Sequence, residues 1–365
     1  MEPSRYFTLT TGLVFVVGAM LMTLATDVHD YTGSQTRTGG YLETDFAPIK
    51  PQEIFPLSMF KSGEGAEDYD QYYDMVVIGD SFSQSPSESW VNFVARDLRA
   101  SAIVFHIDVM DFEALVKNPV FQEYPPKHVL LQSSEGDAFL RLGRLVHLSG
   151  LTSLETHAPI AAERVYASVE KSKTKTVPHK FLRSADLRTR LGIAGHYVKS
   201  AIKRAVFGER VSDVFSLDVD CDTCFSHPNS KKVLVSIRDL DPQAYKFHLK
   251  EQAVAGVLKL SKLIETNCRT RLNTIIFPNK TNVYSRYLSV DTPSVFDGDL
   301  PVNDLHLINV RDALVGAVDL GVMDVYPAHD HHTSAVGYSI AALEVSRTLL
   351  EQDRTDICSP TKLGN

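Results

Sequence analysis

Short apolar runs bounded by turn residues alternate along the chain with segments of helical periodicity. Runs of roughly four to eight apolar residues are typical of buried strands. The expected strands are residues 75–78, 102–107, 128–135, 232–237 and 274–277, and the expected helices are residues 90–95, 112–116, 243–266 and 338–350. Strands and helices in alternation predict an α/β fold with a mostly parallel central sheet.

A different pattern occupies the amino terminus. Residues Phe7 to Ala25 are nineteen consecutive uncharged, mostly apolar positions, preceded by Arg5 and followed by Asp27 and Asp30. This length reaches across a bilayer at about 1.5 Å per residue, so it predicts a membrane anchor or an uncleaved signal segment. The flanking charges favour a cytoplasmic amino terminus and an exported body. Cleavage after Ala25 and a buried core helix are the alternatives.

These patterns divide the chain into segments. The expected division is 1–26 as anchor or signal, 27–70 as a Gly- and Pro-rich linker, 71–350 as the main domain with a basic insertion at about 155–230, and 351–365 as a tail. Between Glu163 and Arg210, twelve Lys or Arg stand against four Asp or Glu. A helix predicted at 196–207 could present this basic face to an anionic polysaccharide or to acidic lipid. A solvated surface helix is the alternative.

Overall composition narrows the functional classes. The chain has 37 basic and 45 acidic residues and a net charge of -8, which argues against a general nucleic-acid binder. Its hydrophobic share of 44% is ordinary for a globular protein.

Four cysteines are present, and two of them form the sequence Cys221-Asp-Thr-Cys224. In an exported chain this pair predicts a local disulfide. A redox role would instead need the pair at the start of a helix that follows a strand. A zinc site would need a second ligand pair nearby, where only His227 is available. No partner is assigned to Cys268 or Cys358.

Candidate chemistry begins where the first expected strand ends, in Gly79-Asp80-Ser81-Phe82-Ser83. Glycine permits a sharp turn, and ligands of open α/β sheets bind beyond the carboxyl ends of strands. Ser81 is therefore placed as an exposed nucleophile, next to helix amides that can hold an oxyanion. The alternative is an ordinary turn in which Ser81 or Ser83 caps the helix.

Some 250 residues later, Asp330 and His332 stand two positions apart, ahead of a predicted helix. A serine nucleophile needs a base to take its proton, and the base needs an acceptor that fixes its tautomer. Asp330 and His332 can supply both functions. Zinc or manganese binding by His329, Asp330, His331 and His332 is the alternative, but four adjacent residues rarely face one ion. We therefore expect no metal, and we expect His331 to point away from the site.

Taken together, Gly-Asp-Ser-Phe-Ser and Asp-x-His-x-Ser-x-x-Gly resemble motifs of the SGNH (GDSL-like) hydrolase superfamily. Within it, the chain most resembles the bacterial alginate O-acetylation proteins, through residues 325–333 and through the strand and Pro-Asn-Lys turn at 275–284. Thr333 stands where that family usually has Trp, and the family's Arg is missing after Glu135-Gly136.

The resemblance implies a three-layer α/β/α domain with Ser81 as nucleophile, His332 as base and Asp330 as its orienting carboxylate. By position, Gln132, Ser133 and Ser134 are the candidates for a second oxyanion donor. Lys280 and Tyr284 are expected to line the site. No cofactor is implied.

The same resemblance implies a polysaccharide O-acetyltransferase that works through an acetyl-serine intermediate. Its acceptor would be an extracytoplasmic polysaccharide, and its acetyl donor a multipass membrane acyltransferase. The chain would be held in the inner membrane by its amino-terminal helix, with the catalytic domain in the periplasm. A carbohydrate acetylesterase with the same three residues, or a non-catalytic polysaccharide-binding component of an export complex, is the alternative.

Overall fold

The computed structural model describes residues 8, 10–18, 46–148, 175–177, 214–227, 231–265, 268–297 and 302–354. The predicted basic helix at 196–207, much of the segment from Phe7 to Ala25, and Cys358 lie outside these residues. Within the described part, we found no helix that is both long and apolar enough to cross a membrane.

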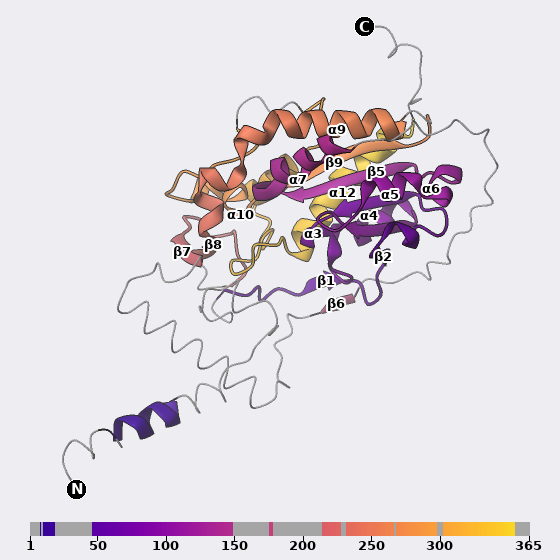
Figure 1. Ribbon diagram of the computed structural model, residues 1–365. Helices are drawn as coiled ribbons and strands as arrows, with labels where there is room; N and C mark the ends of the chain where they lie inside the picture. Colours follow the sequence, from indigo (N-terminus) through magenta and orange to yellow (C-terminus); the bar gives the residue numbers. More distant parts are fainter. Residues whose placement is uncertain are drawn as a thin grey trace.

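A central sheet of six strands organises the domain, and every neighbouring pair in it is parallel. Its order is β10-β9-β5-β3-β4-β2, and Figure 1 labels β9, β5 and β2 of this sheet. The strands are β2 (Lys61–Gly63), β3 (Met75–Gly79), β4 (Ala102–His106), β5 (His128–Ser134), β9 (Arg271–Phe277) and β10 (Leu307–Ile308). The α/β class predicted from the sequence is thereby confirmed.

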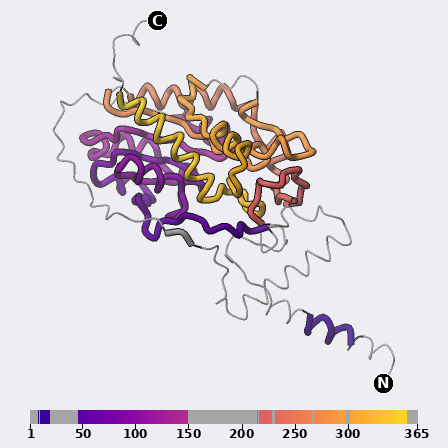
Figure 2. Tube along the Cα trace, turned by 180° about the vertical axis from the view of Figure 1, so that it is seen from behind, coloured from indigo at the N-terminus to yellow at the C-terminus, as the bar shows by residue number. Residues whose placement is uncertain are grey.

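Helices cover both faces of the sheet. Alternate residues of β3 enter two separate hydrophobic clusters, Met75 and Val77 on one face and Val76 and Ile78 on the other. The first face packs against α4 (Trp90–Leu98), α11 (Val310–Asp319) and α12 (Ala335–Gln352), and the second against α5 (Phe112–Lys117), α6 (Pro119–Glu123), α7 (Ala138–Arg144) and α9 (Lys250–Ile264). Figure 2 shows α12, in yellow, in front of the sheet when the molecule is seen from behind. Because both faces are buried, the inner strands β3 and β4 are nearly continuous apolar runs rather than alternating ones.

The strand order also marks a position for a ligand. β3 pairs with β4 on one side and with β5 on the other, so the chain changes direction across the sheet at β3. In open α/β sheets, ligands bind beyond the carboxyl ends of the strands at such a switch point. Ser81 follows the carboxyl end of β3 by two residues.

Two expectations about strands need correction. β2 lies within the range 27–70 that was expected to be a linker, because a short polar segment can serve as the edge strand of a sheet. β8 (Lys232–Ser236) is a strand as predicted, but it pairs antiparallel with β7 (Val214–Asp218) outside the central sheet. Its apolar residues are buried all the same, and burial alone does not specify the sheet to which a strand belongs.

The long helix α9 begins at Lys250 rather than at Gln243. Two 3-10 turns, Pro242–Tyr245 and Phe247–Leu249, precede it and are separated by Lys246, whose φ of 52° interrupts the helical path. The apolar periodicity of this segment continues through these turns, which is why the sequence placed the start of the helix too early.

After β7, Cys221 and Cys224 form a disulfide with a Cα–Cα distance of 5.6 Å. The pair lies in a loop and not at the start of a helix, and Cys224 is buried in the hydrophobic cluster that contains Phe225. Cys268 is disulfide-bonded as well.

Candidate active site

The turn after β3 presents Ser81. Asp80 caps the short helix α3 (Ser81–Gln84), because its Oδ1 accepts a hydrogen bond from the backbone N–H of Phe82 at 3.0 Å. Ser81 is the first residue of this helix and its side chain is exposed, whereas Asp80 and Phe82 on either side are buried. Ser81 therefore has an accessible hydroxyl, and the buried residues on either side of it hold the turn in place.

Buried polar groups support this turn from below. Gln132 accepts hydrogen bonds at Oε1 from the Asp80 N–H (3.0 Å) and the Ser83 hydroxyl (2.7 Å), and its Nε2 donates to Asp80 Oδ1 at 2.9 Å. The indole N–H of Trp90 donates to Ser83 Oγ. A Cβ atom on Gly79 would lie 2.4 Å from Ser83 Oγ and 2.6 Å from Gln132 Oε1. Gly79 is thus needed because there is no space for a side chain. Its backbone is not in the left-handed region, which was the reason for expecting glycine at a sharp turn.

The carboxylate of Asp80 continues this network to Arg141. Asp80 Oδ2 accepts hydrogen bonds from the Ser134 N–H at 2.7 Å and from Arg141 Nη1 at 2.6 Å. The side chains of Asp80 and Arg141 are only 3% and 13% exposed, so the ion pair is shielded from solvent. Arg141 also binds Asp108, where burial would raise the carboxyl pKa but Arg141 outweighs it and holds that pKa below its ordinary value. No Arg follows Glu135-Gly136, yet Arg141 on α7 reaches Asp80 in the turn that carries Ser81.

His332 reaches Ser81 from the opposite end of the sequence. Its Nε2 lies 2.7 Å from Ser81 Oγ, and its Nδ1 lies 3.1 Å from Asp330 Oδ1, which also accepts the backbone N–H of His332 at 3.0 Å. An acceptor at Nδ1 selects the tautomer in which Nε2 is free to accept a proton. The structure therefore brings together the three residues that the sequence predicted as nucleophile, base and orienting carboxylate.

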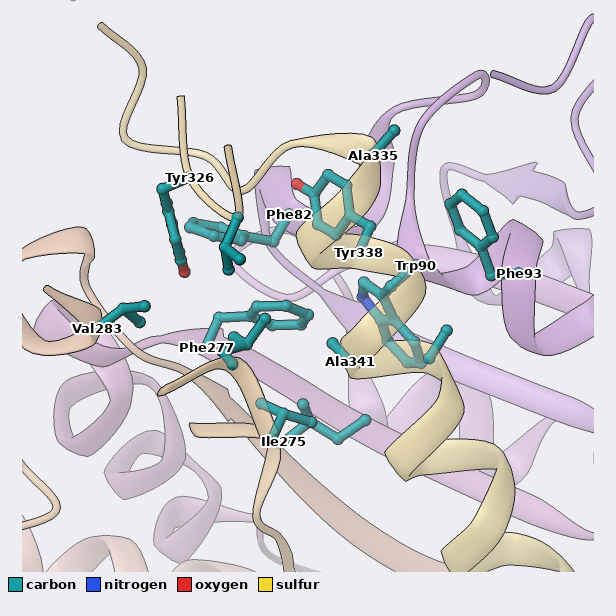
Figure 3. Close-up of a cluster of buried hydrophobic side chains, with 14 of the residues drawn as sticks. Phe82, Trp90, Phe93, Ile275, Phe277, Val283, Tyr326, Ala335, Tyr338 and Ala341 are labelled. Atoms are coloured by element: carbon teal, nitrogen blue, oxygen red, sulfur yellow. The ribbon is translucent and has the colours of Figure 1, made fainter. Parts of the chain in front are cut away.

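Aromatic side chains pack beside the imidazole of His332. The ring of Phe82 lies 4.8 Å from the His332 ring and 5.2 Å from the ring of Phe277, measured between centroids. Figure 3 shows Phe82 above Phe277, with Tyr338 of α12 nearby. Phe82 adjoins Ser81 in the chain, so the helix that carries the hydroxyl also packs against the imidazole of His332.

His332 and Asp330 belong to a closed loop, residues 324–334, which we call the histidine loop. Its end is fastened to its beginning by two hydrogen bonds to the carbonyl of Val325, one from Thr333 Oγ1 (2.8 Å) and one from the Ser334 N–H (3.1 Å). Ser334 also caps α12 through the N–H groups of Val336 and Gly337. Thr333, which stands at the family's Trp position, is therefore a buried support of the loop.

Lys280 and Tyr284, expected to line the site, contact the backbone of the histidine loop. Lys280 begins α10 (Lys280–Val283), and its side chain is 1% exposed. Its ammonium group donates to three loop carbonyls, those of Pro327 (3.4 Å), Ala328 (3.1 Å) and Asp330 (2.9 Å). Burial lowers the pKa of Lys280 to about 8, although the negative charges of Asp330 and Asp239 act in the opposite direction.

Tyr284 holds an earlier point of the same loop. Its hydroxyl accepts the N–H of Tyr326 at 3.0 Å and donates to the carbonyl of Tyr326 at 3.1 Å. The hydroxyl of Tyr326 donates in turn to the carbonyl of Pro278 at 2.5 Å. Both tyrosines are fully buried, so they join the loop to the segment after β9.

Gln132 and Ser133, the candidate oxyanion donors, take part in the network around Asp80. Ser133 Oγ donates to the carbonyl of Ser134 at 3.0 Å and accepts from Arg141 at 3.3 Å. The side-chain amide of Gln132 binds Asp80 and Ser83. Both side chains are fully buried and support the turn that carries Ser81 from below.

A metal ion would compete with the Ser81–His332–Asp330 contacts. Asp330, His331 and His332 each place one possible ligand atom within 4.8 Å of the others. Two of these residues already form the hydrogen-bonded series with Ser81, and His331 Nδ1 lies 3.5 Å from Asp330 with its side chain 48% exposed. Metal binding and proton transfer are therefore alternative uses of the same loop.

Comparisons of the chain with models of protein families, with curated proteins and with solved structures found no match. The resemblance to a family thus remains a prediction from short motifs.

Glu135, directly after β5, is a structural residue of the site that sequence reasoning missed. Its buried carboxylate accepts four hydrogen bonds, from Asn279 N, Asn282 Nδ2, Ser294 Oγ and Val295 N, at 2.6 to 2.9 Å. Burial raises its pKa, and these four donors oppose that effect. Glu135 ties β5 to the segment that carries Lys280. Its position at a strand end was a usable signal, whereas nothing in the sequence pointed to Arg141.

Proposed function

We propose that this chain is a serine-dependent O-acyltransferase of the SGNH type that transfers acetyl groups to hydroxyls of an extracytoplasmic polysaccharide. The observation that carries this proposal is the 2.7 Å contact between Ser81 Oγ and His332 Nε2, in an imidazole whose Nδ1 is bound to Asp330. A hydroxyl within hydrogen-bond reach of an oriented base is the arrangement that nucleophilic catalysis needs.

The reaction would proceed in two halves. Ser81 Oγ attacks the acetyl carbonyl of the donor ester while its proton passes to His332 Nε2, and collapse of the tetrahedral intermediate breaks the bond to the donor alcohol, which leaves with that proton. A sugar hydroxyl then attacks acetyl-Ser81 and gives its proton to His332. Release of Ser81, which recovers the proton, completes the new ester. Asp330 stabilises the imidazolium in both halves.

Charge that develops on the acetyl oxygen needs a donor. The N–H groups of Phe82 and Ser83 are bound to Asp80, at its Oδ1 and its carbonyl respectively. The first N–H of a helix has no acceptor within the helix, so the Ser81 amide is the N–H of α3 best suited to this role.

The fold and the disulfides support the wider proposal. A parallel sheet with helices on both faces agrees with the three-layer domain that the resemblance implies. Disulfides at Cys221–Cys224 and at Cys268 are consistent with an exported protein. The polysaccharide acceptor and a membrane acyltransferase as donor follow from the motif resemblance. We place the chain in the inner membrane through its amino-terminal segment, with the domain in the periplasm.

The proposal is tested by incubating the purified protein with p-nitrophenyl acetate and digesting it for mass spectrometry. We expect an acetyl group on Ser81 in wild-type protein and in the control Ser85→Ala, which removes a neighbouring hydroxyl. Ser81→Ala should lose about 10⁴-fold or more of the turnover rate, the scale on which removal of a serine nucleophile acts. Wild-type turnover in Ser81→Ala would refute the nucleophile and with it the enzyme.

A carbohydrate acetylesterase is the second candidate, and Thr333 favours it. In the related motif a Trp offers a sugar a stacking surface, whereas Thr333 is buried and binds Val325. Assays with a glycan acceptor separate the two activities: acetylated glycan supports the transferase, and free acetate alone supports the esterase. Unchanged polymer acetylation in cells that carry Ser81→Ala would instead favour a non-catalytic component.

A further inference from the structure

We propose that Lys280 is a positioning residue, which holds the histidine loop so that His332 meets Ser81. This inference rests on the proposed function and adds to it a residue that neither reacts nor contacts the substrate. Lys280 follows β9, while the loop it binds precedes α12, so about 50 residues of chain separate the two in sequence.

The three carbonyls that Lys280 binds surround the turn of the loop. Those of Pro327 and Ala328 lie before His329, and that of Asp330 lies directly within the Asp-x-His motif. Hydrogen bonds from an ammonium group to carbonyls are stronger than those between neutral groups. Ala328 O has a second donor, the N–H of Leu234 at 2.8 Å. The carbonyls of Pro327 and Asp330 accept from Lys280 on either side of it.

The other supports of the loop act elsewhere. Thr333 and Ser334 fasten its end to Val325, and Tyr284 fastens Tyr326 near its start. None of these contacts reaches the carbonyl of Asp330. Lys280 does reach it, at 2.9 Å, and so contacts the peptide between Asp330 and His331, whose two residues are the first two of the Asp-x-His motif.

The protonation state of Lys280 decides whether all three bonds can form. An ammonium group has three N–H donors and no acceptor, whereas a neutral amine has two donors and a lone pair that would face one carbonyl. Two carboxylates act on this charge, that of Asp330 in the loop and that of Asp239 after β8. Both stabilise the ammonium form, against the effect of complete burial.

Activity and stability should consequently respond to alkaline pH in opposite ways. The pKa of Lys280 is lowered from 10.5 to about 8, so the unfolded chain binds more protons than the folded one between these values. Lys280 then adds to stability as the pH rises through this window. Loss of activity above pH 8 without loss of folded protein is therefore expected.

The first experiment replaces Lys280 with Met, which has a similar length and no donor, and uses Lys262→Met on the exposed side of α9 as the matched control. Hydrogen exchange, followed by mass spectrometry, should accelerate about 10-fold at amides 328–332 in Lys280→Met only. kcat for acetyl transfer should fall about 10²-fold, the effect of a displacement near 1 Å, while KM changes less than about 3-fold.

The second experiment compares pH–rate profiles of kcat. Wild-type enzyme should lose activity with an apparent pKa of about 8, and Lys280→Met should show no such limb. Asp239→Asn removes a carboxylate that favours the ammonium form and should move the limb to lower pH. This variant keeps an oxygen for the Ser236 N–H and does not alter Lys280 itself, so it serves even if Lys280→Met does not fold.

The outcomes separate the two proposals. Exchange at 328–332 needs no turnover, so it tests Lys280 even if the wild-type protein transfers no acetyl group and the proposed function fails. An active wild type whose Lys280→Met variant keeps normal exchange and kcat, or whose alkaline limb does not move in Asp239→Asn, would overturn the role of Lys280 alone.

Discussion

Gly337, in the first turn of α12, is the residue at which one added methyl group tests how closely the histidine loop packs against this helix. A Cβ atom at this position would lie 1.9 Å from Thr333 Oγ1 and 2.3 Å from the carbonyl oxygen of Val325, whereas real Cβ atoms essentially never come closer than 3.0 Å. Gly337→Ala therefore requires shifts of about 1.1 Å and about 0.7 Å at these two atoms. Rotation of Thr333 relieves only the first contact and breaks its bond to Val325.

The shift at Val325 cannot be absorbed by a side chain, because the obstacle is backbone. Val325 and His332 both lie in the histidine loop, so we expect the imidazole to move by a comparable distance. A misplacement near 1 Å costs about 10²-fold in rate, and an overpacked core costs about 1–3 kcal/mol in the free energy of unfolding. Gly337→Ala should show both effects.

The assay is turnover of p-nitrophenyl acetate at a temperature where the variant remains folded by circular dichroism, together with urea unfolding. Gly316→Ala on α11 is the matched control, because a Cβ there has nothing within 4 Å. Alanine in a helix is favoured over glycine by about 0.5–1 kcal/mol, so the control should be slightly stabilised and fully active. Wild-type turnover in Gly337→Ala would refute the close packing of the loop against α12.

Two predictions concern stability alone. Glu135→Gln places an NH₂ group opposite two of the four donors that now bind the carboxylate, so it should lower the free energy of unfolding in urea by about 2–4 kcal/mol. The exposed control Glu123→Gln should change it very little. Equal urea midpoints for the two variants would contradict the hydrogen bonds to Glu135. Cys221 and Cys224 are only three positions apart, so replacing both with Ser should lower the free energy of unfolding by about 2 kcal/mol in the same experiment. Reduction of the wild-type disulfides should lower it by at least as much.

The parts of the fold that the sequence predicted are those with a strong local pattern. β3, β4, β5 and β9 are apolar runs because helices bury both of their faces, and this burial is what their composition records. β2 escaped prediction because Lys61-Ser62-Gly63 is polar, and its strand conformation comes from pairing with β4. β8 has the pattern of a buried strand, but the choice of its partner is made by tertiary structure.

Some residues of the site could likewise be predicted from the sequence and others could not. Ser81, Asp330 and His332 could be picked out because the contacts that join them are made by side chains of a characteristic type, and a sequence records side-chain types. The residues that hold them bind largely to backbone atoms. Lys280 binds three carbonyls, Tyr284 binds the N–H and the carbonyl of Tyr326, and Glu135 accepts two backbone N–H groups. Every residue has the same backbone carbonyl, so the sequence does not indicate which residue a buried side chain will bind. The one sign of such a contact is a charged side chain in a buried position, which is unfavourable unless it is hydrogen-bonded. This sign can be recognised only once the fold shows which positions are buried.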